Sequence, residues 1–174
     1  MAWYSDLQTG TRMTDAPTPA RWTYRSFEPD MAAEELPRFE ELIRLWQSRR
    51  NGRRVPAWRD FDFLDFKGWH GLISVYEITY DPFDWKVRLS GTCVDHVFGQ
   101  ARTGKTRSEL YADALEEEEA TAFYEKACAD QMICLTRGPI NLQDRDFHWV
   151  EFLELPCSDG PEVATHTIEA MIAL

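Results

Sequence analysis

The clearest periodic pattern near the start of the chain is helical. Apolar residues recur three or four positions apart, at Leu36, Phe39, Leu42, Ile43 and Trp46. This spacing places them on one face of an α-helix. Arg50 suits the C-terminal end, where positive charge complements the helix dipole, and Asn51-Gly52 provides a stop. The pattern predicts an N-terminal helix within residues 34–52.

A two-residue alternation begins after residue 71. Residues 72–80 (LISVYEITY) and 85–91 (WKVRLSG) are rich in β-branched and aromatic side chains, and DPFD joins them. Two such runs with a four-residue connection predict a β-hairpin. Three further strands are expected within residues 132–142, 147–156 and 163–173, separated by turn-forming sequences. The prediction is five strands, split two and three.

Helical segments lie between the second and third predicted strands. A short helix follows Thr92 and ends at Gly99, and the longest helix of the domain should run to about Ala129. Strands that are split in this way do not alternate with helices as βαβ units do. We therefore expect an α+β domain, with a five-stranded antiparallel sheet and helices on one face.

Residues 1–33 differ from the rest of the chain. Gly10, Pro17, Pro19 and Pro29 interrupt any regular pattern, so this stretch can sustain neither a helix nor a central strand. We predict an N-terminal arm over residues 1–33, either loose or docked through its aromatic side chains. Residues 34–174 then form a single domain, and the arm is a reasonable cover for an apolar outer sheet face.

Composition narrows the functional classes. The chain has 174 residues, 19 Lys and Arg against 30 Asp and Glu, and a net charge of −11. This balance argues against nucleic acid and anionic membranes as partners, because both require a positive footprint. No apolar stretch approaches a membrane span. Four irregularly spaced cysteines fit a reducing compartment, so we predict a cytoplasmic location.

Two local motifs suggest chemistry that the surroundings do not support. Gly99-x-x-x-x-Gly104-Lys105-Thr106 matches the phosphate-binding loop consensus, but it follows a helical turn where a buried strand is required, so a loop is expected. Cys93 and His96 have the spacing of two metal ligands on a helix. The other Cys and His residues form no second pair, and no metal site is predicted.

The order of these elements, together with several short motifs, resembles a family of small stand-alone bacterial PAS-domain proteins. The motifs are Leu45-Trp46, Arg50, Gly52, residues 55–62 (VPAWRDFD), residues 87–92 (VRLSGT), Phe98-Gly99, Thr103-Gly104 and residues 151–156 (EFLELP). The resemblance covers residues 36–173 and implies a small cavity between the sheet and the connecting helices. No cofactor is predicted: the long helix lacks the axial histidine of haem-binding relatives, and the cysteine motif of flavin-binding light sensors is absent.

Strand alternation and helical spacing then select the residues that should line this cavity. They are Val87, Leu89, Val94, Phe98, Phe123, Trp149 and Glu151. Arg88 is a candidate buried charge, because it also lies between apolar neighbours in a strand; the alternative for Arg88 and Glu151 is a solvent-facing sheet surface. A one-residue shift in register would turn each strand residue to the opposite face.

The leading hypothesis is a non-enzymatic sensory or adaptor domain. A small molecule would bind in the cavity, and the signal would pass to an unidentified protein partner or through a homodimer. An alternative is a purely structural dimerisation module, whose core is filled and binds no ligand. A small enzyme that uses the phosphate-loop-like segment is the least favoured hypothesis.

Overall fold

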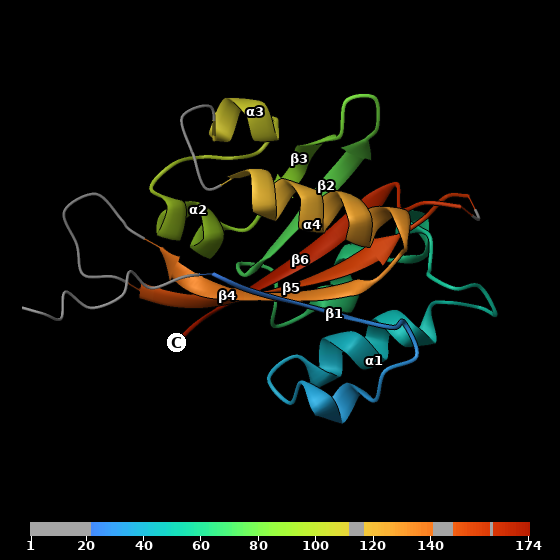
Figure 1. Ribbon diagram of the computed structural model, residues 1–174. Helices are drawn as coiled ribbons and strands as arrows, with labels where there is room; N and C mark the ends of the chain where they lie inside the picture. Colours follow the sequence, from blue (N-terminus) through green and yellow to red (C-terminus); the bar gives the residue numbers. More distant parts are fainter. Residues whose placement is uncertain (1–21, 112–116, 141–147, 161) are drawn as a thin grey trace, which may run out of the picture.

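The computed structural model describes residues 22–111, 117–140, 148–160 and 162–174. All the strands of these residues belong to one antiparallel sheet, in the order β1-β4-β5-β6-β2-β3 (Figure 1). The strands are β1 (Thr23–Phe27), β2 (Ile73–Thr79), β3 (Asp84–Ser90), β4 (Ile133–Ile140), β5 (His148–Cys157) and β6 (His166–Ala173). The predicted α+β class with an antiparallel sheet is confirmed.

The sheet gains a sixth strand from the predicted arm. All five expected strands are present, and β1 adds to them by pairing with β4. Its position at the edge agrees with the expectation that this stretch could not supply a central strand. The unit therefore begins before residue 34. Residues 1–21 of the arm, Trp3 among them, lie outside the described residues.

Helices lie on both faces of the sheet. The connecting helices α2 (Thr92–Phe98), α3 (Arg107–Leu110) and α4 (Glu117–Ala129) cover one face, as expected for the central part of the chain (Figure 1). The opposite face carries α1 (Glu40–Ser48), which is shorter than the predicted helix because the chain turns through residues 37–39 before it begins. Short 3₁₀ turns at Ala33–Glu35, Trp58–Asp60 and Phe63–Phe66 accompany it.

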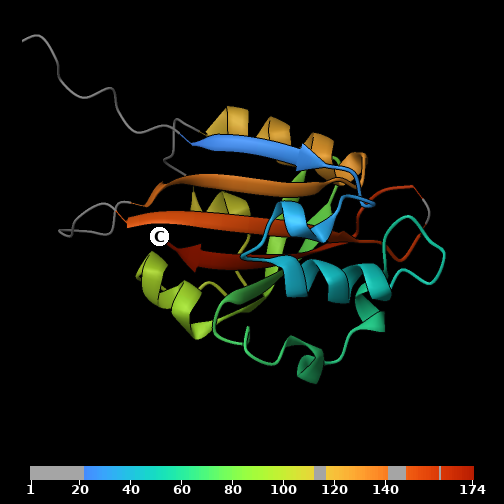
Figure 2. The same ribbon diagram turned by 90° about the horizontal axis from the view of Figure 1, so that it is seen from below.

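Part of the α1 face of the sheet is covered by α1 and the short turns beside it (Figure 2). Phe39, Ile43 and Trp46 are almost fully buried against Leu153, Leu155 and other residues of the sheet. The Trp46 indole N–H also donates a hydrogen bond to the Pro156 carbonyl at 2.9 Å. Each such side chain stabilises the fold by roughly 1.5–3 kcal/mol through burial. α1 provides much of this cover, and Phe27, Met31 and Ala33 of the predicted arm pack against the same cluster.

The segment that matches the phosphate-loop consensus is a loop along the edge of β3. Gly99 adopts a left-handed conformation, with φ of +68°, and ends α2. Gly104 N–H then donates to the Val87 carbonyl at 2.7 Å, and Val87 N–H donates to the Lys105 carbonyl at 2.9 Å. The Lys105 ammonium contacts the Gln100 side chain at 2.9 Å. The predicted loop is confirmed, and it places Arg102 against Phe98 of α2.

Candidate functional site

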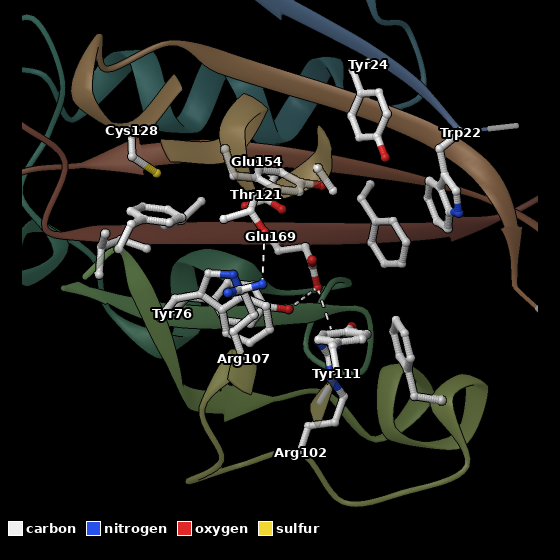
Figure 3. Close-up of a pocket in the computed structure, with 18 residues that line it drawn as sticks. Trp22, Tyr24, Tyr76, Arg102, Arg107, Tyr111, Thr121, Cys128, Glu154 and Glu169 are labelled. Carbon is white, nitrogen blue, oxygen red and sulfur yellow. Dashed lines mark hydrogen bonds and ion pairs between the residues drawn. The ribbon is translucent and has the colours of Figure 1, made fainter. Parts of the chain in front are cut away.

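A cavity of about 280 Å³ lies between the sheet and the helices α2, α3 and α4 (Figure 3). Its walls are largely aromatic, and two of the rings come from Tyr24 of the edge strand β1 and from Trp22 just before it. The aromatic lining residues are Trp22, Tyr24, Tyr76, Phe83, Trp85, Phe98, Tyr111, Tyr124 and Phe152. Its volume is close to the lower end of small-molecule pockets, about 300 Å³.

Two glutamates project into this cavity from the centre of the sheet. Glu154 on β5 and Glu169 on β6 are direct partners across the antiparallel ladder, so their side chains start on the same face. Glu169 is buried, whereas Glu154 keeps some surface toward the cavity. The Tyr76 hydroxyl donates to Glu169 Oε1 at 2.6 Å, which Figure 3 marks. A buried carboxyl pair is costly unless protons or cations compensate it.

Arg102 supplies a compensating cation from the loop after α2. The carboxylate of Asp95 fixes the loop by accepting from the Arg102 backbone N–H at 3.2 Å and from the Ser90 hydroxyl at 2.6 Å. The side chain of Arg102 is only 2% exposed. Its guanidinium carbon lies 4.1 Å from the centre of the Phe98 ring, and Nη1 lies 3.9 Å from Glu169 Oε1.

Arg107 joins two helices beside the cavity. It begins α3, and its Nη1 donates to the Thr121 hydroxyl of α4 at 2.9 Å. Its Nε also lies 3.9 Å from Asp84 Oδ1 on β3. The first contact attaches α3 to α4, as Figure 3 shows for Thr121, and the second attaches α3 to β3.

Burial raises the pKa values of both carboxyls of this pair. Burial, and then the charge of Glu169, raise the pKa of Glu154 well above its ordinary value. Burial also raises the pKa of Glu169, but Arg102 and the Tyr76 hydrogen bond oppose that shift. Glu154 therefore holds a proton more strongly than Glu169, the carboxyl that lies nearer to Arg102.

Of the seven predicted cavity residues, one lines the cavity, and three others pack beside it or elsewhere without lining it. Phe98 is part of the cavity wall. Val87 and Val94 are fully buried in the neighbouring core and do not line the cavity. Phe123 on α4 packs against Tyr24, with ring centres 5.2 Å apart.

The other three predicted residues lie on the α1 face of the sheet. On β5, Phe152 and Glu154 line the cavity, so Trp149 and Glu151 point the other way. Trp149 is 36% exposed, and Glu151 pairs with Arg38 at 2.8 Å. On β3, an irregularity opposite Val75 and Tyr76 inserts one extra residue, and Leu89 packs into the core beneath α1. A bulge of this kind reverses the facing of everything beyond it.

Arg88 is an exposed charge. Its side chain is 59% exposed, and it pairs with Glu77 on the neighbouring strand at 3.2 Å. The prediction of a buried charge at this position was wrong, because Arg88 is the extra residue of the β3 irregularity. The solvent-facing alternative is the observed one.

Sequence reasoning missed the charged residues that do line the cavity. Glu154 and Glu169 each lie between apolar neighbours in a strand, the same signal that was applied to Arg88 and Glu151. A choice of the opposite strand face would have found Glu154. No comparable signal marks Arg102, because its burial depends on how the loop folds back along β3.

Among the described residues, no histidine or methionine lines the cavity as a haem ligand. Burial raises the pKa of the Cys128 thiol to about 12 and the pKa values of Tyr76 and Tyr124 well above 10, which disfavours the anionic forms that ligate haem iron. Over the same described residues, no group of three or more His, Cys, Asp or Glu side chains is arranged to hold a metal ion.

Comparison with known proteins identifies the fold. No family model and no curated protein matches the chain. A solved structure of an RNA-binding Light-Oxygen-Voltage receptor superposes with a TM-score of 0.51 and 18% identity, over 90% of this chain and 40% of that receptor chain. The chain has a PAS-like fold. The PAS-like domain spans about 40% of the length of this neighbour.

The same comparison contradicts the prediction that nucleic acid is excluded as a partner. A chain of this fold belongs to a receptor described as RNA-binding. The prediction relied on the net charge of the whole chain, but binding depends on local charge. Residues 36–59 contain seven arginines and two glutamates, a local net charge of +5 within a chain of −11.

No helix in the described ranges combines the length and apolar character needed to cross a bilayer.

Proposed function

We propose that this PAS-like domain is a non-enzymatic sensory domain that binds a small molecule in the cavity and signals through protein contacts. The supporting observation is a cavity of about 280 Å³ into which buried, charged side chains project. A ligand pocket typically combines apolar and aromatic walls with a few convergent polar groups. The cavity of this domain has that composition.

The alternative of a purely structural module is less well supported. Such a module would fill its core with apolar side chains, because burying ionised groups costs several kcal/mol per ion. Here Arg102, Glu154 and Glu169 converge where apolar side chains would pack at lower cost. Retaining this cluster is easier to explain if it recognises a ligand.

The edge strand β1 offers a route from ligand to partner. Trp22 and Tyr24 line the cavity, and Trp22 stacks on Phe152 with ring centres 6.1 Å apart. β1 pairs with β4 on one side only, and its other edge is unpaired among the described strands. A ligand that contacts these rings would favour one placement of β1. A partner strand or a second copy of the domain could then add to the free edge.

Native mass spectrometry and thermal-shift screening of the full chain test ligand binding. Ala120 lines the cavity from α4, whereas Ala122 on the same helix is exposed. Ala120→Phe should fill the cavity, and Ala122→Phe is the matched control. We expect a retained mass or screening hits with wild type and Ala122→Phe, and their loss with Ala120→Phe. Identical hits for all three proteins, or none for wild type in a broad metabolite screen, would reject the proposal.

RNA binding is a second candidate, favoured by the arginine-rich segment 36–59 and by the RNA-binding neighbour. Each of the seven arginines pairs with an acidic side chain, for example Arg38 with Glu151 and Arg54 with Glu28. Exposed pairs of this kind contribute only about 0–1 kcal/mol, so phosphates could compete for the same arginines.

Fluorescence anisotropy with a labelled single-stranded RNA tests this second candidate. Binding should weaken steeply as salt rises, because phosphate contacts release counterions. Arg54→Glu should weaken it, whereas Arg88→Glu, outside the segment, serves as the control. No binding at low salt, or equal loss with both variants, would remove this candidate.

A further inference from the structure

The buried guanidinium of Arg102 has donors without acceptors. Nε and Nη1 are buried and have no hydrogen-bond partner within the described part of the chain, and the 3.9 Å separation from Glu169 is too long for a hydrogen bond. Only Nη2 donates, to the Tyr111 hydroxyl at 3.4 Å. A buried donor left unsatisfied destabilises the fold, so an acceptor is expected to reach this group from the cavity.

Charge favours an anionic acceptor. Arg102 is a buried cation, and the Glu169 carboxylate approaches its Nη1 only to 3.9 Å. The other guanidinium of the described lining, Arg107, already pairs with Asp84 at 3.9 Å. An anionic group that accepts from Arg102 forms charge-assisted hydrogen bonds, which are roughly twice as strong as neutral ones. A cationic ligand would add a third positive charge and compete with Arg102 for the ring of Phe98.

The walls favour a flat, apolar body. The rings of Tyr76 and Trp85 lie 4.8 Å apart, and Trp85 meets Tyr111 edge-on at 6.0 Å. Rings at these separations pack on one another, and the surfaces that they turn to the cavity suit a further ring in stacked or edge-to-face contact. An apolar cavity of about 150 Å³ holds benzene. The larger volume of this cavity, about 280 Å³, therefore leaves room for one ring and a polar head group.

We propose that the cavity binds a small monocarboxylic acid with a single flat ring, and that the unpaired N–H groups of Arg102 hold its carboxylate. Nη2 carries a second N–H, and together with either Nε or Nη1 it presents two parallel donors to a carboxylate. This inference rests on the proposed ligand-binding function and adds the class of ligand.

Isothermal titration calorimetry of the full chain with matched one-ring probes tests the ligand class. Benzoate and phenylacetate carry the carboxylate, benzamide replaces it with a neutral amide, and benzylamine replaces it with a cation. The carboxylates should bind wild type at least tenfold more tightly than the amide, and benzylamine should not bind. Benzylamine or benzamide binding as tightly as the acids would overturn the inference.

Arg102→Lys distinguishes a requirement for two parallel N–H donors from a requirement for positive charge alone. It keeps the positive charge but cannot form two parallel hydrogen bonds, so carboxylate affinity should fall at least tenfold. Arg88→Lys, on the exposed edge of β3, should leave affinity unchanged. Unchanged affinity in Arg102→Lys would overturn the assignment of this residue. If Arg102→Lys does not fold, the comparison of probes on wild type still decides the class.

The two proposals can fail separately. A broad screen that finds a ligand of another class, whose binding Ala120→Phe removes, would overturn the carboxylate inference and leave the sensory function standing. Carboxylates that bind wild type and Ala120→Phe equally would bind outside the cavity, and would overturn both.

Discussion

Replacing Glu154 by glutamine should remove a pH dependence from the stability of the domain. Glutamine has nearly the shape of a protonated glutamate, so the cavity floor keeps its packing and its donor. Wild-type Glu154 lies beside Glu169 on the adjacent strand, and burial raises its pKa well above 4.5. The folded protein therefore keeps a proton that the unfolded chain releases.

The sign and size of the effect follow from proton linkage. A carboxyl with a raised folded pKa stabilises the fold fully below its unfolded pKa, and this contribution is lost as pH rises toward the folded pKa. The window opens at the unfolded value of 4.5. One proton is worth roughly 1.4 kcal/mol per pH unit inside the window. The free energy of unfolding of wild type should therefore fall relative to that of Glu154→Gln as pH rises above 4.5.

Urea unfolding of both proteins at several pH values above 5 measures this difference. Glu151→Gln is the matched control, because Glu151 lies on the same strand but faces α1 and pairs with Arg38. Its difference from wild type should change little with pH. Parallel stability curves for wild type and Glu154→Gln would refute the reasoning, because they would mean that Glu154 titrates as an ordinary carboxyl in the folded state.

Three further predictions concern two buried positions and one exposed ion pair. Trp46→Ala should lower the free energy of unfolding by about 3–5 kcal/mol in urea, because a fully buried indole is removed; a loss under 1 kcal/mol would contradict this. Gly138→Ala should destabilise by about 1–3 kcal/mol and alter the near-ultraviolet dichroism, because a Cβ there would lie 2.3 Å from the Trp22 ring. Gly160→Ala, where a Cβ meets nothing within 4 Å, is its control. Arg88→Ala should change the melting midpoint little, because exposed ion pairs contribute about 0–1 kcal/mol. A large fall in the melting midpoint would contradict the exposed placement of Arg88.

Much of the fold could be predicted because it is local. The helical spacing of Phe39, Ile43 and Trp46 predicted α1, and two-residue alternation predicted five of the six strands. The sixth, β1, carries only five residues between turn-forming segments. Its strand conformation depends on pairing with β4, far along the chain, so local pattern could not predict it.

The sequence by itself determined the class of the domain, the order of its elements, and the loop at Gly99. Only the tertiary structure decided which face of each strand meets the cavity. The irregularity in β3 sends Leu89 to the opposite face, and the register of β5 places Glu154 inside and Glu151 outside. Alternation fixes which residues share a face, but it does not say which face is inside. That choice, like the burial of Arg102, follows from the elements that pack against the sheet.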